Sequence, residues 1–203
     1  MFVQPDILLA DAGGALGTAF NAGLPFVLIC TAGLIVLHLI ITFVRRGQRV
    51  ERPPWSLWEK LVYLATLVSV AGLGVTSFFT VMRFGAMHGW ALFAHMVAAG
   101  MFTFVLPVLA ITWCGVNRFA VQSGPEKDSE DAPRFFWLPR ATFWVILAGG
   151  LVVTLTMLLS MLPVFGTEGL QSLLDVHRYA GLVVVVAMIL HLYSVTIQCL
   201  GLN

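Results

Sequence analysis

Charged residues are scarce in this sequence. Of its 203 residues, 10% are charged and 59% are hydrophobic, and the mean hydropathy is +0.94. A soluble globular domain carries roughly 25% charged residues, so the composition excludes that class. The formal net charge is +1, which gives no support for binding nucleic acid through a basic surface.

Cysteine motifs are also absent. The three cysteines, Cys30, Cys114 and Cys199, are far apart in sequence, and neither a CxxC nor a CxxCH sequence occurs. These absences argue against a thiol oxidoreductase, a zinc site and covalently attached c-type haem. We interpret all three cysteines as small apolar packing residues, because free cysteine usually behaves as a buried hydrophobe.

Long apolar runs, in contrast, fill most of the chain. The five runs cover residues 24–44, 61–82, 90–114, 143–161 and 176–197. Arg178 is the one charged residue within them. Each run has about the 20 residues that an α-helix needs to cross the hydrocarbon core of a membrane. The sequence therefore predicts an all-α integral membrane protein, in which residues 1–203 form a single membrane domain, a bundle of five transmembrane helices.

Basic residues are distributed unevenly between the connections of these helices. Nine precede the second or the fourth run, namely Arg45, Arg46, Arg49, Arg52, Lys60, Arg118, Lys127, Arg134 and Arg140. Only Arg83 and Arg178 fall on the other side. Cytoplasmic loops are enriched in Lys and Arg, so the N-terminus is predicted outside and the C-terminus in the cytoplasm. Residues 1–22 lack a basic segment before their apolar part, and we expect them to be an outer tail rather than a cleaved signal peptide.

All five histidines lie within or at the edge of the apolar runs. They are His38, His88, His95, His177 and His191. An ionisable residue at membrane depth is a functional hypothesis by default, because an unpartnered polar group there costs several kcal/mol. The alternative is a neutral histidine that donates to the carbonyl of a neighbouring helix. That alternative explains a single histidine in a span better than it explains four histidines at matched depths.

The depths of four histidines match in pairs. His177 and His191 are 14 residues apart, which places them ~21 Å apart along one helix and on nearly the same face. His95 lies at the outer level of His177, and His38 lies at the inner level of His191. Neutral imidazole is a standard axial ligand of haem iron, and bundle interiors hold such cofactors. We therefore expect two stacked b haems, the outer one on His95 and His177 and the inner one on His38 and His191, with a single haem as the alternative.

Three further residues are candidates near the outer haem. Gly181 follows His177 by one turn, where a glycine serves either close helix packing or clearance for a flat macrocycle. Arg83 and Arg178 could pair with haem propionates, or their side chains could extend to the membrane surface without a partner. We do not assign His88 as a ligand.

The fifth run resembles a known family. The segment from His177 to Gly181 (HRYAG), followed by His191 and Tyr193, is similar to the last helix of the cytochrome b (gamma) subunits of membrane-bound formate dehydrogenases and nickel–iron hydrogenases. His95, with Asn117 22 residues later, resembles that family's second core helix. The resemblance covers roughly residues 58–200 at the level of motifs.

This resemblance implies a function and its partners. It implies a subunit of the prokaryotic cytoplasmic membrane that carries two b haems and exchanges electrons with quinone near the inner haem. The implied outer-face partner is an iron–sulfur or multihaem cytochrome c subunit, with or without a catalytic subunit. By position, His95 and His177 would hold the outer haem and His191 the inner one. The family's other inner ligand corresponds to about residues 58–60, where no histidine occurs, and we infer that His38 on an additional N-terminal helix replaces it.

Two other functions remain open. A transporter or proton channel would use the histidines as a relay, but Asp and Glu are absent from the five runs, which counts against it. A haem-free anchor would use the histidines only to tie helices together. The sequence shows no stand-alone catalytic domain, so we assign no reaction beyond electron transfer with quinone, whose pocket we expect near the inner haem and the connection between the first two helices.

Overall fold

The computed structural model describes residues 14–44, 55–115, 117 and 137–200, and these residues are mainly helical. The uninterrupted helices are α2 (Gly14–Val44), α5 (Gly89–Trp113), α6 (Trp137–Ser160) and α7 (Thr167–Leu200). The remaining span consists of α3 (Leu57–Gly74), the π-helical turn η1 (Val75–Phe79) and α4 (Thr80–Phe84) in direct succession. Within the described residues, five helices are long and apolar enough to cross a membrane, which confirms the all-helical, multi-pass prediction.

Most helices extend beyond the predicted runs. Helix α2 begins at Gly14, inside the predicted outer tail, and α7 begins at Thr167, nine residues before the fifth run. Polar residues such as Asn21 in α2 and Asp175 in α7 interrupt the apolar pattern, whereas backbone hydrogen bonding continues through them. The start of α3 shows this directly. Glu59 N donates to Ser56 Oγ at 3.2 Å and Ser56 N donates to Glu59 Oε2 at 2.7 Å, which is a capping box.

Several predictions from sequence fall on residues 1–13, 45–54 and 118–136, outside the described residues. Most of the basic residues that determined the predicted orientation belong to these segments. The cysteine interpretation is wrong in part. Cys30 and Cys199 are exposed on helix surfaces, and Cys114 is only partly buried, because α2 and the end of α7 each turn one side away from the other helices.

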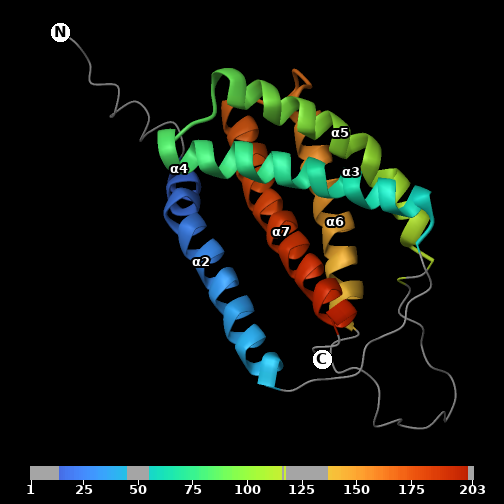
Figure 1. Ribbon diagram of the computed structural model, residues 1–203. Coiled ribbons are helices and arrows are strands. Elements are labelled where there is room, and N and C mark those ends of the chain that lie inside the picture. The colour runs from blue at the N-terminus through green and yellow to red at the C-terminus, as the bar shows by residue number, and fades with distance from the viewer. Residues whose placement is uncertain (1–13, 45–54, 116, 118–136, 201–203) are drawn as a thin grey trace, which may run out of the picture.

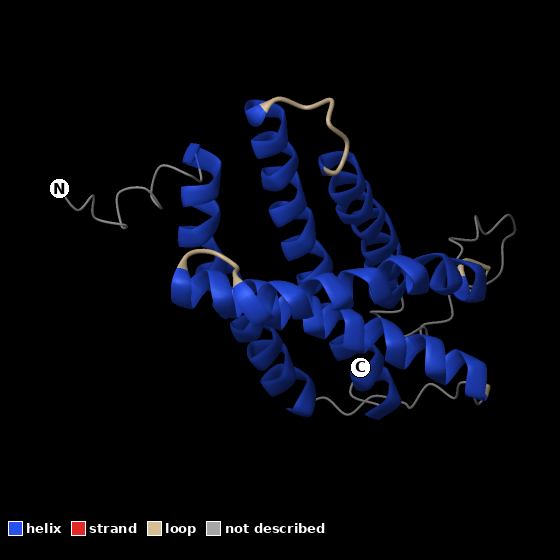
Figure 2. Ribbon diagram, turned by 90° about the horizontal axis from the view of Figure 1, so that it is seen from above, coloured by secondary structure: helices blue, strands red, loops and turns tan. Residues whose placement is uncertain are grey.

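The helices pack as two antiparallel pairs. Figure 1 shows α6 beside α7 and α3 beside α5, and it shows the second pair crossing the first; Figure 2 shows the same crossing from above. Small residues line both pairs. A Cβ on Gly149 of α6 would lie 2.7 Å from Val184 of α7, and one on Gly72 of α3 would lie 3.3 Å from Ala98 of α5. Glycines at these points let the helix backbones approach closely.

The main core lies where the two pairs cross. It contains buried residues of all four helices, including Val70, Phe102, Ile146 and Val184. Gly150 of α6 belongs to the same contact, because a Cβ there would lie 2.9 Å from Phe102. The axes of the five spans are therefore not all aligned, as they would be in a simple up-and-down bundle.

Helix α2 joins the others along α7 (Figure 1). A second buried cluster forms between them from Phe20, Leu24, Phe78 and Leu182. The opposite side of α2 exposes many large apolar side chains, such as Ile29, which is 70% exposed. An apolar surface of this extent suits contact with lipid rather than water.

Candidate functional site

His177 is held by two groups of the neighbouring helix. Its Nδ1 lies 3.3 Å from the carbonyl oxygen of Val153 and 3.2 Å from Thr156 Oγ1, both on α6. The Thr156 hydroxyl itself donates to the carbonyls of Val152 and Val153, each at 2.9 Å. A carbonyl only accepts, so the hydrogen of the imidazole is placed on Nδ1. In a neutral ring the lone pair is then on Nε2, as a metal-binding histidine requires.

His191 has the same surroundings one level further along α7. Its Nδ1 lies 3.2 Å from the carbonyl oxygen of Pro139 and 3.0 Å from Thr142 Oγ1. Thr142 in turn donates to the carbonyl of Leu138 at 2.8 Å. We call this arrangement, a carbonyl and a threonine hydroxyl three residues later, a histidine cradle. Because α6 and α7 are antiparallel, the 14-residue spacing of the two histidines is matched by a 14-residue spacing of the two threonines.

A third cradle holds His95. Its Nδ1 lies 3.1 Å from Thr76 Oγ1, and the ring also hydrogen-bonds the carbonyl of Leu73. The Thr76 hydroxyl donates to the carbonyl of Gly72 at 2.6 Å. Thr76 lies in η1, and π-helical turns inside α-helices occur frequently at functional sites. Three of the four predicted ligands therefore present the same nitrogen, Nε2, away from the helix that supports them.

The structure brings the two predicted outer ligands together. His95 comes from α5 and His177 from α7, and the two rings are close enough for their charges to interact. Both side chains are partly buried. These are the residues that the sequence analysis assigned to the outer haem.

The two predicted inner residues have different neighbours. His38 Nδ1 and the Tyr193 hydroxyl are joined by a 2.5 Å hydrogen bond, and their rings pack edge to face with centroids 5.7 Å apart. The ring of His191 lies 6.1 Å from that of Tyr63 on α3. Positions 191 and 193 are about 200° apart around a helix. His38 and His191 thus make these contacts on nearly opposite faces of α7.

The space beside Gly181 is open. A Cβ added there would meet no atom within 4 Å, in contrast to the tightly packed Gly149. Gly181 lies one turn from His177 and on nearly the same face of α7. The helix therefore leaves clearance next to one predicted ligand of the outer haem.

The two predicted propionate partners, Arg178 and Arg83, have the following contacts in the structure. Arg178 forms an ion pair with Asp175 at 3.3 Å, and a Cβ on Gly17 of α2 would lie 2.8 Å from its guanidinium. Arg83 is exposed, with its guanidinium carbon 5.9 Å from the ring centroid of Phe84. Asp175, 7% exposed, also corrects an expectation. The fifth helix begins early enough to include this buried acid, so the absence of acids from the apolar runs does not extend to the whole helix.

Two groups of residues remain, the histidine that was not assigned as a ligand and the threonines of the cradles. His88 is exposed and immediately precedes α5, with its ring 5.7 Å from Phe84. The threonines Thr76, Thr142 and Thr156 were missed in the sequence analysis. The spacing of 14 residues between Thr142, just before the fourth run, and Thr156 within it equals that of the two histidines on the fifth run, and this signal could have revealed both threonines.

No protein-family profile, curated protein or solved structure matches this chain. Across the ranges that the structure describes, no group of three or more His, Cys, Asp or Glu side chains is placed to hold a metal ion. Haem iron needs fewer protein ligands than such a site, because the macrocycle supplies its equatorial nitrogens. Two opposed imidazoles are sufficient.

Proposed function

We propose that this chain is a b-type cytochrome that moves electrons between a redox partner at the outer membrane face and the quinone pool. The observation that carries the proposal is the set of three histidine cradles. Each cradle holds the imidazole in the tautomer that binds iron through Nε2, and two of the three histidines lie close together from different helices.

The residues of the outer level fit a haem. His95 and His177 would supply its two axial ligands, and the open space beside Gly181 gives clearance for the macrocycle. When bound, a b haem supplies a one-electron carrier within the hydrocarbon region. The cradles of Thr76 and Thr156 orient the rings and increase the basicity of the ligating nitrogens.

The inner level fits one ligand of a second haem. His191 has a cradle that matches that of His177 in both partners and spacing. His38 remains the sequence-based candidate for the opposite ligand, although its described contact is with Tyr193. A protein with a single haem on His95 and His177 is the alternative.

The proposal also includes the orientation of the chain in the membrane and its partner subunits. The excess of Lys and Arg in the first and third connections supports an external N-terminus and a cytoplasmic C-terminus. The family resemblance supports a place in a prokaryotic cytoplasmic membrane. It also supports an outer-face partner that is an iron–sulfur or multihaem cytochrome c subunit, alone or with a catalytic subunit.

Haem content tests the proposal directly. The protein, purified in detergent, is expected to show the absorption spectrum of low-spin, bis-imidazole b haem, and a pyridine haemochrome assay gives the haem content per polypeptide. The cradles also tie pairs of helices together, which is all that a haem-free anchor would require. A colourless preparation with native helical content, from cells able to make haem, would exclude the cytochrome and favour the anchor.

A further inference from the structure

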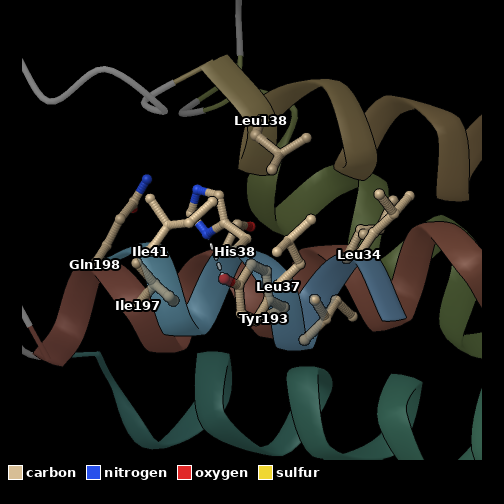
Figure 3. A pocket seen from close by; sticks show the side chains of 11 residues that line it. Leu34, Leu37, His38, Ile41, Leu138, Tyr193, Ile197 and Gln198 are labelled. Carbon is tan, nitrogen blue, oxygen red and sulfur yellow. Dashed lines mark hydrogen bonds between the residues drawn. The ribbon is translucent and has the colours of Figure 1, made fainter. Parts of the chain in front are cut away.

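A pocket of about 340 Å³ lies between α2 and α7, beside the start of α6. Its volume is within the range of about 300–1,000 Å³ typical of small-molecule sites. Most of its lining is aliphatic, with Leu34 and Ile41 from α2 and Ile197 from α7 among the side chains. Figure 3 shows His38 and Tyr193 pointing toward each other in this lining, joined by their hydrogen bond.

We infer that this pocket binds the ring of a quinone, with the His38–Tyr193 pair hydrogen-bonded to a ring oxygen. The inference rests on the proposed electron-transfer function, which it deepens by assigning the quinone site. A quinone ring is flat and mostly apolar, with oxygens at two opposite positions. An aliphatic pocket with a few convergent polar groups matches that chemistry.

The pocket adjoins the inner histidine through the backbone of α7. Leu190 and Ser194, which line it, lie on either side of His191 in sequence, and Ser194 Oγ donates to the carbonyl of His191 at 2.8 Å. From α6, Leu138 lines the pocket, and the next residue, Pro139, accepts the Nδ1 hydrogen bond of His191. An occupant therefore lies at about the level of His191 along α7, on another face of the helix.

The pocket is also accessible from the lipid. Leu34 and Leu37 line it and are nevertheless 66% and 55% exposed on the apolar surface of α2. A quinone dissolved in the bilayer could therefore enter without crossing water. A lipid acyl chain has no group that can hydrogen-bond the histidine–tyrosine pair, whereas an oxygen of the quinone ring accepts a hydrogen bond from it.

This assignment gives His38 a role other than haem ligation. Helix α2 lies outside residues 58–200, the stretch over which the sequence resembles the formate dehydrogenase and hydrogenase subunits. The pocket is thus a feature of this chain's additional helix. His38 holds and orients the Tyr193 hydroxyl at one end of the ring.

Binding of a quinone analogue tests the inference. The fluorescent analogue 2-heptyl-4-hydroxyquinoline N-oxide is titrated into the full-length protein in lipid nanodiscs, and its quenching gives Kd. Tyr193→Phe removes only the hydroxyl and is expected to weaken binding about tenfold. Leu34→Trp fills the pocket from its exposed side and is expected to abolish binding. Tyr179→Phe is the matched control, because Tyr179 also hydrogen-bonds α2, through the carbonyl of Leu16 at 3.1 Å, but lies outside the pocket.

Haem content measured on the same samples separates the two proposals. Unchanged haem with weaker binding in Tyr193→Phe and Leu34→Trp supports the pocket. Wild-type affinity in both variants overturns it, as does loss of one haem per polypeptide in His38→Ala, which would make His38 a ligand. A colourless wild-type protein that still binds the analogue, and loses it in Leu34→Trp, would refute the cytochrome while leaving the pocket in place.

Discussion

The histidine pairs predicted for the outer and inner halves of this membrane domain have different surroundings in the structure. In the predicted outer pair, His95 of α5 and His177 of α7 each have a cradle and lie within range of an electrostatic interaction with each other. In the inner half, His191 has a cradle, but His38 is bonded to a tyrosine on another face of α7. Counted along the sequence, both pairs were predicted to match in depth. The comparison teaches that a matched position in the sequence does not by itself define a ligand pair, because the face of the helix that each histidine contacts also decides it.

The largest expected effect is loss of the outer haem. His177→Ala and His95→Ala each remove one axial ligand of the same site, so each is expected to lower the haem content by one per polypeptide in the pyridine haemochrome assay. The helical content by circular dichroism should stay near that of the wild type, because the core at the helix crossing is untouched. The control is His88→Ala, an exposed histidine at the start of α5. Equal haem content in the wild type and the three variants would contradict the assignment of a haem to His95 and His177.

The inner half gives the sharpest contrast between two histidines. Under the pocket assignment, His38→Ala is expected to keep the wild-type haem content, whereas His191→Ala is expected to remove the haem that His191 ligates. The reason is that His191 faces α6 and Tyr63, whereas the described hydrogen bond of His38 is to Tyr193, on nearly the opposite face of α7. If both variants lose the same haem, the two halves are alike after all and the pairing predicted from depth is correct.

The cradles can be weakened one level at a time. Thr156→Val and Thr142→Val each remove a hydroxyl at nearly constant side-chain size. Loss of such a supporting hydrogen bond lowers metal-site affinity by about 10–100-fold, and we expect the lower end because the backbone carbonyl remains. Thr156→Val should accelerate loss of the outer haem to an apoprotein acceptor, and Thr142→Val should act on the inner one.

Thr103→Val is the control for these variants. Thr103 is exposed on α5 and donates to the carbonyl of Ala99 on its own helix. Its replacement should leave both rates unchanged. Equal acceleration of both haems by either cradle variant would mean that the hydroxyls act on the general stability of the protein rather than on their own levels.

The sequence was sufficient for some features and not for others. The five spans follow from apolar length alone, and the 14-residue spacing of His177 and His191 correctly placed both on one helix. The contrast with His38 could not be foreseen, because the face of α7 that α2 covers depends on tertiary packing. The same holds for Arg178, whose partner Asp175 became part of the fifth helix only because helical structure continues beyond the apolar run.

The smallest effects distinguish two glycines of the α6–α7 pair. A Cβ on Gly149 would lie 2.7 Å from Val184, so Gly149→Ala should force the helices apart and cost about 1–3 kcal/mol of stability, seen as a lower unfolding temperature of the haem-free protein.

Gly181→Ala should behave in the opposite way. Apart from the backbone of its own helix and its chain neighbours, no described atom would lie within 4 Å of the new methyl group. Alanine favours helix by about 1 kcal/mol over glycine, so the haem-free protein should be no less stable. A macrocycle on His177 would use that same space, so the outer haem should dissociate faster in this variant than in the wild type. Wild-type haem retention in Gly181→Ala would show that the clearance beside His177 serves another purpose. That result would count against the proposed outer haem site and would not affect the description of the fold.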